Sequence, residues 1–351
     1  MSSARSSRPC DGPVELTSTQ KLTLRRLRRR LNAPRDVVFG IFGVGLLRLV
    51  RRSDPIQAAE LTARLTRRVG PWTKYHRIGR ENLALAFPEK PVDEREAILM
   101  GVWENVGRTA AEYAHLDRLW DYDWENPNQG RITSDQAEEF NKLRDDGKPG
   151  VIFAAHLGNW ELPALLTGIY GFKGGVFYRA PHNARLAAEV KRIRQGLMGQ
   201  LIPSTGIEGL VRARAILEDG GHVGMLVDQH CRTGTPVTFF GRECLANPLL
   251  ARLARLYECP IVGVRVVRLL QRRFRIDAAG PIDPPRDTKG RIDEQRTMQV
   301  ITSIIEGWVG EHPEQWLWLH RRWRKLSGSH RWATGGQVRR RSRRPYERDS
   351  A

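Results

Sequence analysis

The chain of 351 residues contains little cysteine, and its four thiols form neither a C-x-x-C pair nor another metal-ligand spacing. This scarcity argues against a disulfide framework and predicts reduced thiols in a cytosolic setting. The sequence also lacks an uncharged apolar run of about 20 residues, which a membrane-spanning helix requires. The run Val37–Leu47 is too short to span by itself. No small-residue cleavage pattern follows it, so an ordinary signal peptide is not expected.

Acidic residues are scarce as well, because 39 aspartates and glutamates face 58 lysines and arginines, for a formal net charge of +19. Such an excess predicts an anionic partner, which can be nucleic acid, an anionic membrane face, an acidic protein or a phosphate-bearing substrate. The length is sufficient to bury a sizeable core in one large domain or two smaller ones.

The N-terminal region divides into two expected parts. Residues 1–20 contain serine and proline without apolar periodicity and are expected to be disordered. In residues 21–54, the basic stretch Lys21–Arg30 precedes the apolar run Val37–Leu47, which arginines flank on both sides. This pattern favours a basic amphipathic helix and an interfacial membrane anchor. The alternatives are a solvated charged arm for the first segment and a buried core helix for the second.

The rest of the chain predicts a helical region and an α/β core. Residues 55–128 place apolar side chains at three- and four-residue steps, which indicates helices. Residues 129–326 alternate short apolar runs with helical patterns, so we expect a mixed, mostly parallel central sheet flanked by helices. Strands are expected at 131–133, 151–155, 175–178, 223–227, 261–267 and 274–276. The basic tail 327–351 is expected to be disordered.

The stretch VIFAAHLGNWELP at Val151–Pro163 is the most informative part of the core. An apolar run bounded by turn signals is typical of a buried strand, and here it ends in His156 before a Gly-Asn turn and a helix start. Open α/β sheets place ligand chemistry at the carboxyl ends of their strands. Histidine is the usual general base near neutral pH, and Glu161 is a carboxylate that can fix its tautomer. The alternative is a histidine that only satisfies a loop hydrogen bond.

Asp228 ends another predicted strand, so it is expected at the same edge of the sheet as His156. It can position His156, bind a substrate hydroxyl or cap the next turn. Arg179 and Arg194 follow His156 in fold order and are candidates for substrate phosphate, because a guanidinium pairs two-pronged with phosphate oxygens. A metal site built from His156, Glu161, Asp228 and His230 is conceivable by residue type, but the spacing does not support one.

Several motifs occur in order along the chain. They are Asn82-Leu83 with Phe87-Pro88-Glu89, HLGNWE at His156–Glu161, Asp228-Gln229, Phe239-Phe240-Gly241, and PEQWLWLHRRW at Pro313–Trp323. Together they resemble the bacterial lipid A late acyltransferases, a lauroyl/myristoyl acyltransferase family of lysophospholipid acyltransferase-like enzymes. Trp316, Trp318 and Trp323 in the last motif can be membrane-interface anchors or core packing residues.

The resemblance implies acyl transfer from acyl carrier protein to a hydroxyl on an acyl chain of the lipid A precursor, without metal or organic cofactor. It implies that His156 and Glu161 form the catalytic pair, and that the enzyme works at the cytoplasmic face of the bacterial inner membrane. The residues expected to bind substrate are Asn159, Arg179, Arg194, Asp228 and Gln229.

Two other functions remain open from the sequence. One is an acyltransferase of the same chemistry acting on another membrane glycolipid, such as a phosphatidylinositol mannoside. The other is a nucleic-acid-binding protein, which the net charge alone suggests. The basic residues flank an apolar segment and a His/Glu corner rather than a nucleic-acid-binding motif, so no nucleic-acid partner is expected.

Overall fold

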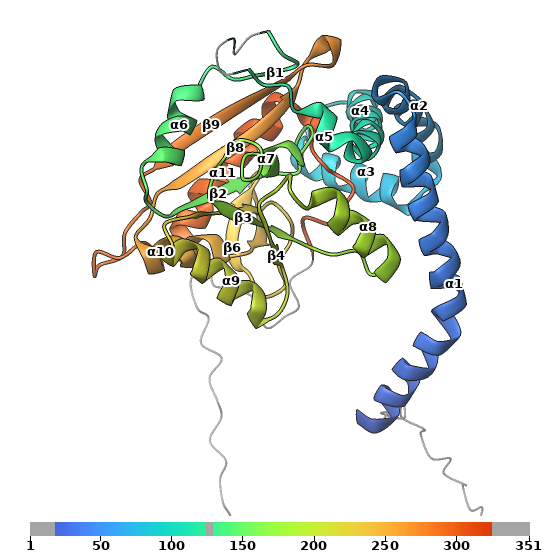
Figure 1. The fold of residues 1–351 in the computed structure, drawn as a ribbon, viewed down its shortest axis with the longest axis horizontal. Coiled ribbons are helices and arrows are strands. Elements are labelled where there is room, and N and C mark those ends of the chain that lie inside the picture. The colour runs from blue at the N-terminus through green and yellow to red at the C-terminus, as the bar shows by residue number, and fades with distance from the viewer. Residues whose placement is uncertain (1–17, 124–125, 127–128, 325–351) are drawn as a thin grey trace, which may run out of the picture.

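The computed structural model describes residues 18–123, 126 and 129–324. Within them, a seven-stranded sheet has the order β1-β9-β8-β2-β5-β3-β4 (Figure 1). Neighbouring strands are parallel except for the antiparallel pair β8 and β9. The strands are β1 Ile132–Thr133, β2 Gly150–Ala154, β3 Gly174–Tyr178, β4 Gln200–Pro203, β5 His222–Leu226, β8 Ile261–Arg268 and β9 Phe274–Ile282. The predicted mostly parallel α/β sheet is therefore confirmed.

Helices cover both faces of this sheet, as Figure 1 shows. They and the N-terminal helices have the bounds α1 Ser18–Arg52, α2 Pro55–Val69, α3 Lys74–Ala86, α4 Val92–Glu112, α5 Leu116–Leu119, α6 Ala137–Asp145, α7 Leu162–Leu165, α8 Ala184–Arg194, α9 Ile207–Glu218, α10 Leu249–Tyr257 and α11 Glu294–Glu311. Side chains alternate between the faces along a strand. Val151 and Phe153 of β2 therefore join one hydrophobic core with α9, α10 and α11. Ile152 joins a second core with α6, α7 and α8.

Some elements differ from the sequence prediction. The strand β4 was not expected, and neither was the two-stranded hairpin of β6, Thr235–Phe239, and β7, Arg242–Ala246. Helix α7 has four residues, although 162–169 were predicted to be helical. Proline, threonine and glycine are frequent in these segments, and such residues obscure the periodicity on which strand and helix predictions depend.

Helices α2, α3 and α4 pack beside the sheet. Helix α2 approaches α4 closely at Gly107, where an added Cβ would lie 2.2 Å from Thr66 Oγ1. The Thr66 hydroxyl donates a 2.7 Å hydrogen bond to the carbonyl of Trp103 on α4. A glycine at this position therefore sets the distance between the two helices, and α4 is held firmly where it passes behind the sheet edge.

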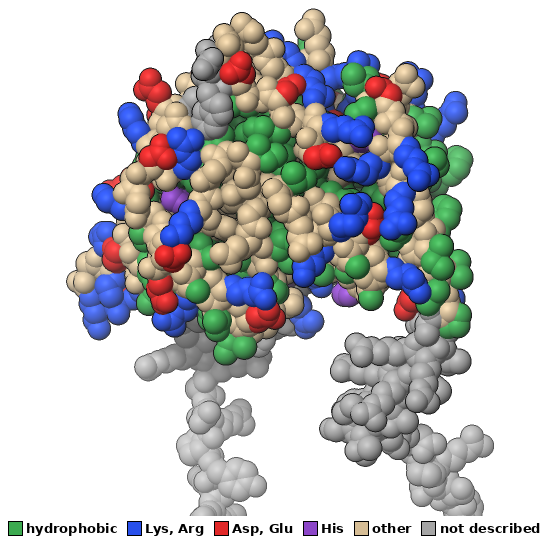
Figure 2. Space-filling model, viewed as in Figure 1, with side chains coloured by type: hydrophobic (Ala, Val, Ile, Leu, Met, Phe, Trp, Pro, Cys, Tyr) green, Lys and Arg blue, Asp and Glu red, His purple; other side chains and the backbone are tan. Residues whose placement is uncertain are grey.

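Helix α1 runs continuously through Pro34, so the two segments expected separately form one helix. Its described part leaves apolar side chains exposed, among them Val38, Phe39 and Phe42. Apolar and basic side chains lie together along α1 in Figure 2. In the described part of the chain, no helix combines the length and the apolarity needed to cross a membrane. Of residues 1–20, which were predicted to be disordered, Ser18–Gln20 instead belong to helix α1, because the helix extends back beyond the basic stretch. Residues 1–17 and the tail 327–351 lie outside the described residues.

Candidate active site

The parallel register of β2 and β5 brings His156 and Asp228 together. Ala154 at the end of β2 is paired with Leu226 at the end of β5. His156 and Asp228 each follow two residues after these paired ends. The two side chains therefore meet at the carboxyl edge of the sheet, where open parallel sheets place their ligand sites.

Asp228 is fully buried and is held by three donors. Its Oδ1 lies 2.8 Å from His156 Nδ1, while Oδ2 accepts from the His156 backbone N–H at 2.8 Å and from Trp316 Nε1 at 2.7 Å. Burial alone would raise the pKa of Asp228, but the charge and hydrogen bonds of His156 outweigh it and hold the pKa well below its usual range. The carboxylate is therefore ionised at neutral pH.

An ionised Asp228 can only accept hydrogen bonds. The proton between them therefore lies on His156 Nδ1, and Nε2 of the neutral imidazole carries the free lone pair. Burial would lower the pKa of His156, but the negative charge and hydrogen bond of Asp228, with a further contribution from Glu161, raise it above its usual value. The exposed side chain of Gln229 brings its Nε2 to 3.2 Å from His156 Nε2. The basic nitrogen thus points toward a polar group at the surface.

Glu161 contacts a different residue. Its Oε2 accepts a 2.6 Å hydrogen bond from Arg194, and the same guanidinium donates to the Tyr113 hydroxyl at 3.0 Å. Among the described residues, Glu161 forms no hydrogen bond with His156, so it acts on the imidazole only through space. The carboxylate that orients His156 is Asp228, in place of the Glu161 contact expected from the H-x4-E spacing.

An apolar cavity lies directly beside this corner. Glu161 and Arg194 form its polar part, and its apolar lining includes Ile152, Trp160, Leu166, Val176, Phe177 and Met225. These residues come from β2, β3, β5 and the segment after His156, so the cavity opens between strands of the parallel sheet and α7. The Trp160 ring is 5.7 Å from the His156 ring, which places the cavity next to the imidazole.

The C-terminal aromatic motif packs under the same corner. Trp316 and Trp318 are fully buried, and their rings meet edge to face at 4.6 Å. Their expected alternative role as membrane-interface anchors is therefore wrong, because neither ring reaches the surface. Asn82 links helix α3 to this aromatic motif, since its Nδ2 donates to the carbonyls of Trp318 and His320 at 2.7 and 2.6 Å.

The sequence of the chain is similar to that of known proteins. A sequence model described as bacterial lipid A biosynthesis acyltransferase matches residues 26–325. The chain belongs to this acyltransferase family. It is 22% identical over 286 residues to lipid A biosynthesis acyltransferase 2 of Shigella flexneri, covering 80% of this chain and 88% of that protein. It is 25% identical over 293 residues to lipid A biosynthesis palmitoleoyltransferase of Escherichia coli strain K12, covering 81% and 90%.

In this acyltransferase, one polar face of α4 holds the His156 turn from behind. Asn105 donates to the carbonyls of Gly158 and Gln315 at 2.9 and 3.0 Å. Glu112 accepts from Asn159 Nδ2 at 2.8 Å, and Arg268 binds Glu112 with two N–H groups at 2.6 and 2.9 Å. Sequence reasoning missed this group. Its signal is the recurrence of polar residues at the helical positions 105, 109 and 112, within an apolar pattern.

The Gly158 backbone in the same turn has a positive φ of 57°. A Cβ at this position would lie 2.2 Å from the carbonyl oxygen of Val266, so both the conformation and the space require glycine. The turn is thus fixed by β8 on one side and by α4 on the other.

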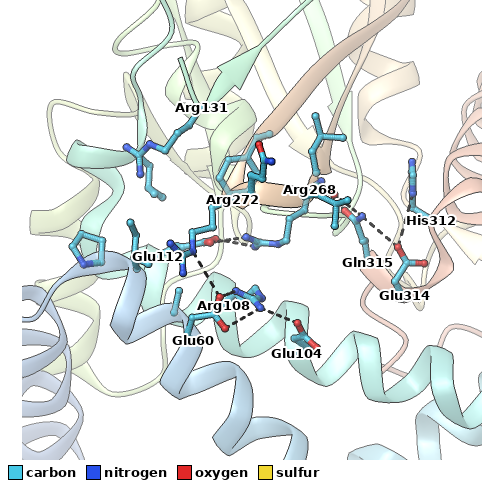
Figure 3. Close-up of a pocket in the computed structure, with 18 residues that line it drawn as sticks. Glu60, Glu104, Arg108, Glu112, Arg131, Arg268, Arg272, His312, Glu314 and Gln315 are labelled. Carbon is cyan, nitrogen blue, oxygen red and sulfur yellow. Dashed lines mark hydrogen bonds and ion pairs between the residues drawn. The ribbon is translucent and has the colours of Figure 1, made fainter. Parts of the chain in front are cut away.

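A cavity of about 680 Å³ opens behind this group. Figure 3 shows Arg268 beside Glu112, and Arg108 between Glu60 and Glu104. The arginines that line the cavity are close to carboxylates: Arg108 binds Glu60 and Glu104, Arg131 binds Asp121, and Arg272 lies 3.8 Å from Glu60. Because these charges are compensated, the cavity has little excess positive charge with which to attract an anion.

The other predicted substrate-binding residues have different surroundings. Asn159 is fully buried, and its Oδ1 accepts from the Glu161 N–H, so it shapes the turn. Arg179 is exposed just after β3, and within the described residues it has no hydrogen bond or ion pair. Arg194 is engaged by Glu161 and Tyr113 and is not a free cation. The described residues contain no group of three His, Cys, Asp or Glu side chains that could hold a metal ion.

Proposed function

We propose that this acyltransferase moves a fatty acyl group from acyl carrier protein to a hydroxyl of an acyl chain on the lipid A precursor, with His156 as general base. The observation that carries the mechanism is the Asp228–His156 hydrogen bond, which leaves Nε2 as the basic atom. The names of the relatives in lipid A biosynthesis support the substrate class.

In the proposed reaction, the acceptor hydroxyl displaces Gln229 from His156 Nε2 and gives its proton to that nitrogen. The hydroxyl oxygen forms a bond to the thioester carbonyl carbon. The tetrahedral intermediate then expels the carrier thiolate, which takes the proton back from the imidazolium. Asp228 stabilises the imidazolium throughout, because it is ionised and cannot move away from its three donors. The Gln229 amide is a donor close enough to hold the reacting oxygen.

We assign the apolar cavity beside Trp160 to the first carbons of the fatty acyl chain, because its volume of about 70 Å³ accommodates only a few methylene groups. Its lining is apolar except at the Glu161–Arg194 end, and it lies next to the imidazole. Glu161 adds negative charge near His156 and so favours the imidazolium that forms during the reaction. In this proposal, Arg194 holds Glu161 in place at the edge of the acyl cavity through their ion pair.

We also propose that the enzyme works on the cytoplasmic face of the inner membrane. Exposed apolar residues of α1 and α2, such as Phe42, Leu61 and Leu65, accompany basic residues such as Arg64 and Arg68. Such a surface suits binding to an anionic lipid interface. Flotation with anionic but not neutral vesicles tests this proposal, and equal flotation with both would contradict it.

The decisive experiment uses the purified full chain, an acylated carrier protein and a detergent-dispersed lipid A precursor, with mass spectrometry of the product. We expect one added acyl chain with the wild type. His156→Ala should lower kcat by on the order of 10²–10⁴-fold, as is usual for loss of a general base. The control is His182→Ala, because His182 is exposed and forms no hydrogen bond or ion pair with His156 or Asp228 among the described residues. Wild-type turnover in His156→Ala would exclude the mechanism.

A further inference from the structure

The loop that follows Asp228 lies against a buried arginine, Arg322, that has no acidic partner among the described residues. Arg322 is only 1% exposed. Its Nη1 donates to the carbonyl of Leu245 at 2.9 Å, and the backbone N–H of Cys231 donates to the same oxygen at 3.3 Å. This shared carbonyl places the Arg322 guanidinium against the loop 228–231, which also supplies Asp228 and Gln229 to His156.

The remaining contacts of Arg322 do not neutralise its charge. The guanidinium carbon lies 5.3 Å from the centre of the Phe239 ring, and Nε is buried without a hydrogen-bond partner among the described residues. Among those residues, no carboxylate forms an ion pair with Arg322. Glu306, a carboxylate of the same neighbourhood, accepts instead from the Phe240 N–H. Burying a guanidinium without a counter-charge is unfavourable, so its presence here calls for an anion.

A neutral histidine and two further arginines accompany this arginine. His230 follows Gln229 directly, and its buried Nδ1 also has no partner among the described residues. Arg232 directly follows Cys231, whose N–H shares the Leu245 carbonyl with Arg322, and Arg324 lies two residues after Arg322. Burial, together with the positive charges of these three arginines, lowers the pKa of His230. Arg232 and Arg324 are exposed and have no ion pair within the described part of the chain. This set, Arg322 with His230, Arg232 and Arg324, is called the loop cation cluster.

The loop cation cluster differs from the other arginine-rich region, the cavity in Figure 3, in charge compensation. In that cavity Arg108 and Arg268 are bound by carboxylates. Among the described residues, no carboxylate forms an ion pair with an arginine of the loop cation cluster. The nearby carboxylate Asp228 is already engaged by His156 and Trp316. The electrostatic attraction for an anion is therefore stronger at this cluster than at the cavity.

We propose that the loop cation cluster binds a phosphate group of a substrate next to Gln229 and His156. Phosphate fits because a guanidinium presents parallel N–H donors that match its oxygens, and neutral His230 can add a further polar contact. The inference rests on the proposed acyl transfer, which offers two phosphate sources. One is a phosphate on the glycolipid acceptor, and the other is the phosphodiester in the prosthetic arm of the carrier protein.

A binding experiment tests the site without acyl transfer. Titration of the full chain with inorganic phosphate, followed by ³¹P NMR, should show saturable binding. Arg232→Ala/Arg324→Ala should weaken it by roughly tenfold or more, as expected for loss of charge-assisted hydrogen bonds. The control is Arg212→Ala/Arg214→Ala on α9, which removes the same charge from exposed residues and should bind phosphate as the wild type does. Equal weakening in both double variants, or in neither, would overturn the proposal.

Arg322 is tested by Arg322→Met, which keeps an unbranched side chain but removes the charge. If the arginine is an anion receptor, this variant loses phosphate binding while its melting temperature stays equal to or above that of the wild type, because an unpaired buried charge has been removed. Arg322→Lys should bind phosphate weakly, since lysine keeps the positive charge but lacks the parallel N–H donors of the guanidinium. A lower melting temperature of Arg322→Met with unchanged phosphate binding would show that the residue is only structural.

Steady-state kinetics identify the source. In Arg232→Ala/Arg324→Ala, a raised KM for the glycolipid alone assigns the site to the acceptor, and a raised KM for the acylated carrier alone assigns it to the donor. An unchanged KM for both substrates contradicts the proposal. If the chain shows no acyl transfer at all but still binds phosphate at this cluster, the proposed function fails and the anion site stands.

Discussion

Two carboxylates lie near His156, but they are held in different ways. Asp228 is fully buried, and it binds both the imidazole and the backbone of His156. Glu161 is bound by Arg194 at the polar end of an apolar cavity and reaches the imidazole only through its electric field. The comparison shows that closeness in sequence does not determine which carboxylate contacts His156. The register of the neighbouring strand β5 determines it.

The largest expected effect separates these two roles. Asp228→Asn should lower kcat by on the order of 10²–10⁴-fold, because a neutral amide can no longer hold the Nδ1–H tautomer or stabilise the imidazolium. Steady-state kinetics with a thermal melt measures this. Asp277→Asn is the control, because that carboxylate pairs with Arg265 and Arg275 at β9. A loss in Asp228→Asn no larger than in the control would remove Asp228 from the mechanism.

A smaller effect is expected at the other carboxylate. Glu161→Gln should lower kcat by roughly tenfold, as expected for loss of one through-space attraction of about 1–1.5 kcal/mol. The control is Glu189→Gln. This change breaks the ion pairs of Glu189 with Arg48 on α1 and with Arg192 on α8, and it leaves the His156–Asp228 pair intact. If Glu161→Gln equals Asp228→Asn in its loss of turnover, then Glu161 acts directly on the reacting groups, and the distinction drawn between the two carboxylates is wrong.

The support behind the turn should matter mainly for stability. Glu112→Gln leaves Arg268 without its counter-charge and should reduce the free energy of unfolding by about 3 kcal/mol, with a several-fold loss of kcat as the Asn159 turn loosens. Denaturant unfolding measures the first effect. Glu60→Gln, on the wall of the same cavity but in a more exposed ion pair with Arg108, should cost about 1 kcal/mol or less. Equal losses in the two variants would mean that the buried pair has no special role.

The smallest effect is a displacement of the pH profile. Because the pKa of His156 is raised, the base is free only above that pKa, so the acid limb of kcat/KM should lie above the ordinary histidine pKa of about 6.5. In Asp228→Asn the remaining influence of burial lowers the pKa, and the acid limb of the residual activity should move to lower pH. Rates measured between about pH 5 and 9 test this sign. An acid limb that moves to higher pH in Asp228→Asn would contradict the proposal that Asp228 raises the pKa of His156.

Part of this result follows from the sequence. The run Val151–Ala155 predicts a buried strand, and the Gly-Asn pair predicts the turn that begins at His156; both are present because apolar runs and turn residues act locally. The placement of Asp228 at the same sheet edge also followed from its position after an apolar run. The hairpin of β6 and β7 escaped prediction, because its alternation is interrupted by polar and proline residues.

The sequence by itself determined the α/β alternation, the basic charge, the histidine at a strand end and the family motifs, because each depends on composition or on neighbours along the chain. Only the tertiary structure decided that Asp228 and not Glu161 touches the imidazole, and that Arg194 forms an ion pair with Glu161. It also decided that Arg322 is buried without a carboxylate partner in the described part of the chain. The His156–Asp228 contact joins residues 72 positions apart. Such contacts depend on strand order and register across the whole sheet, and local preferences do not fix these.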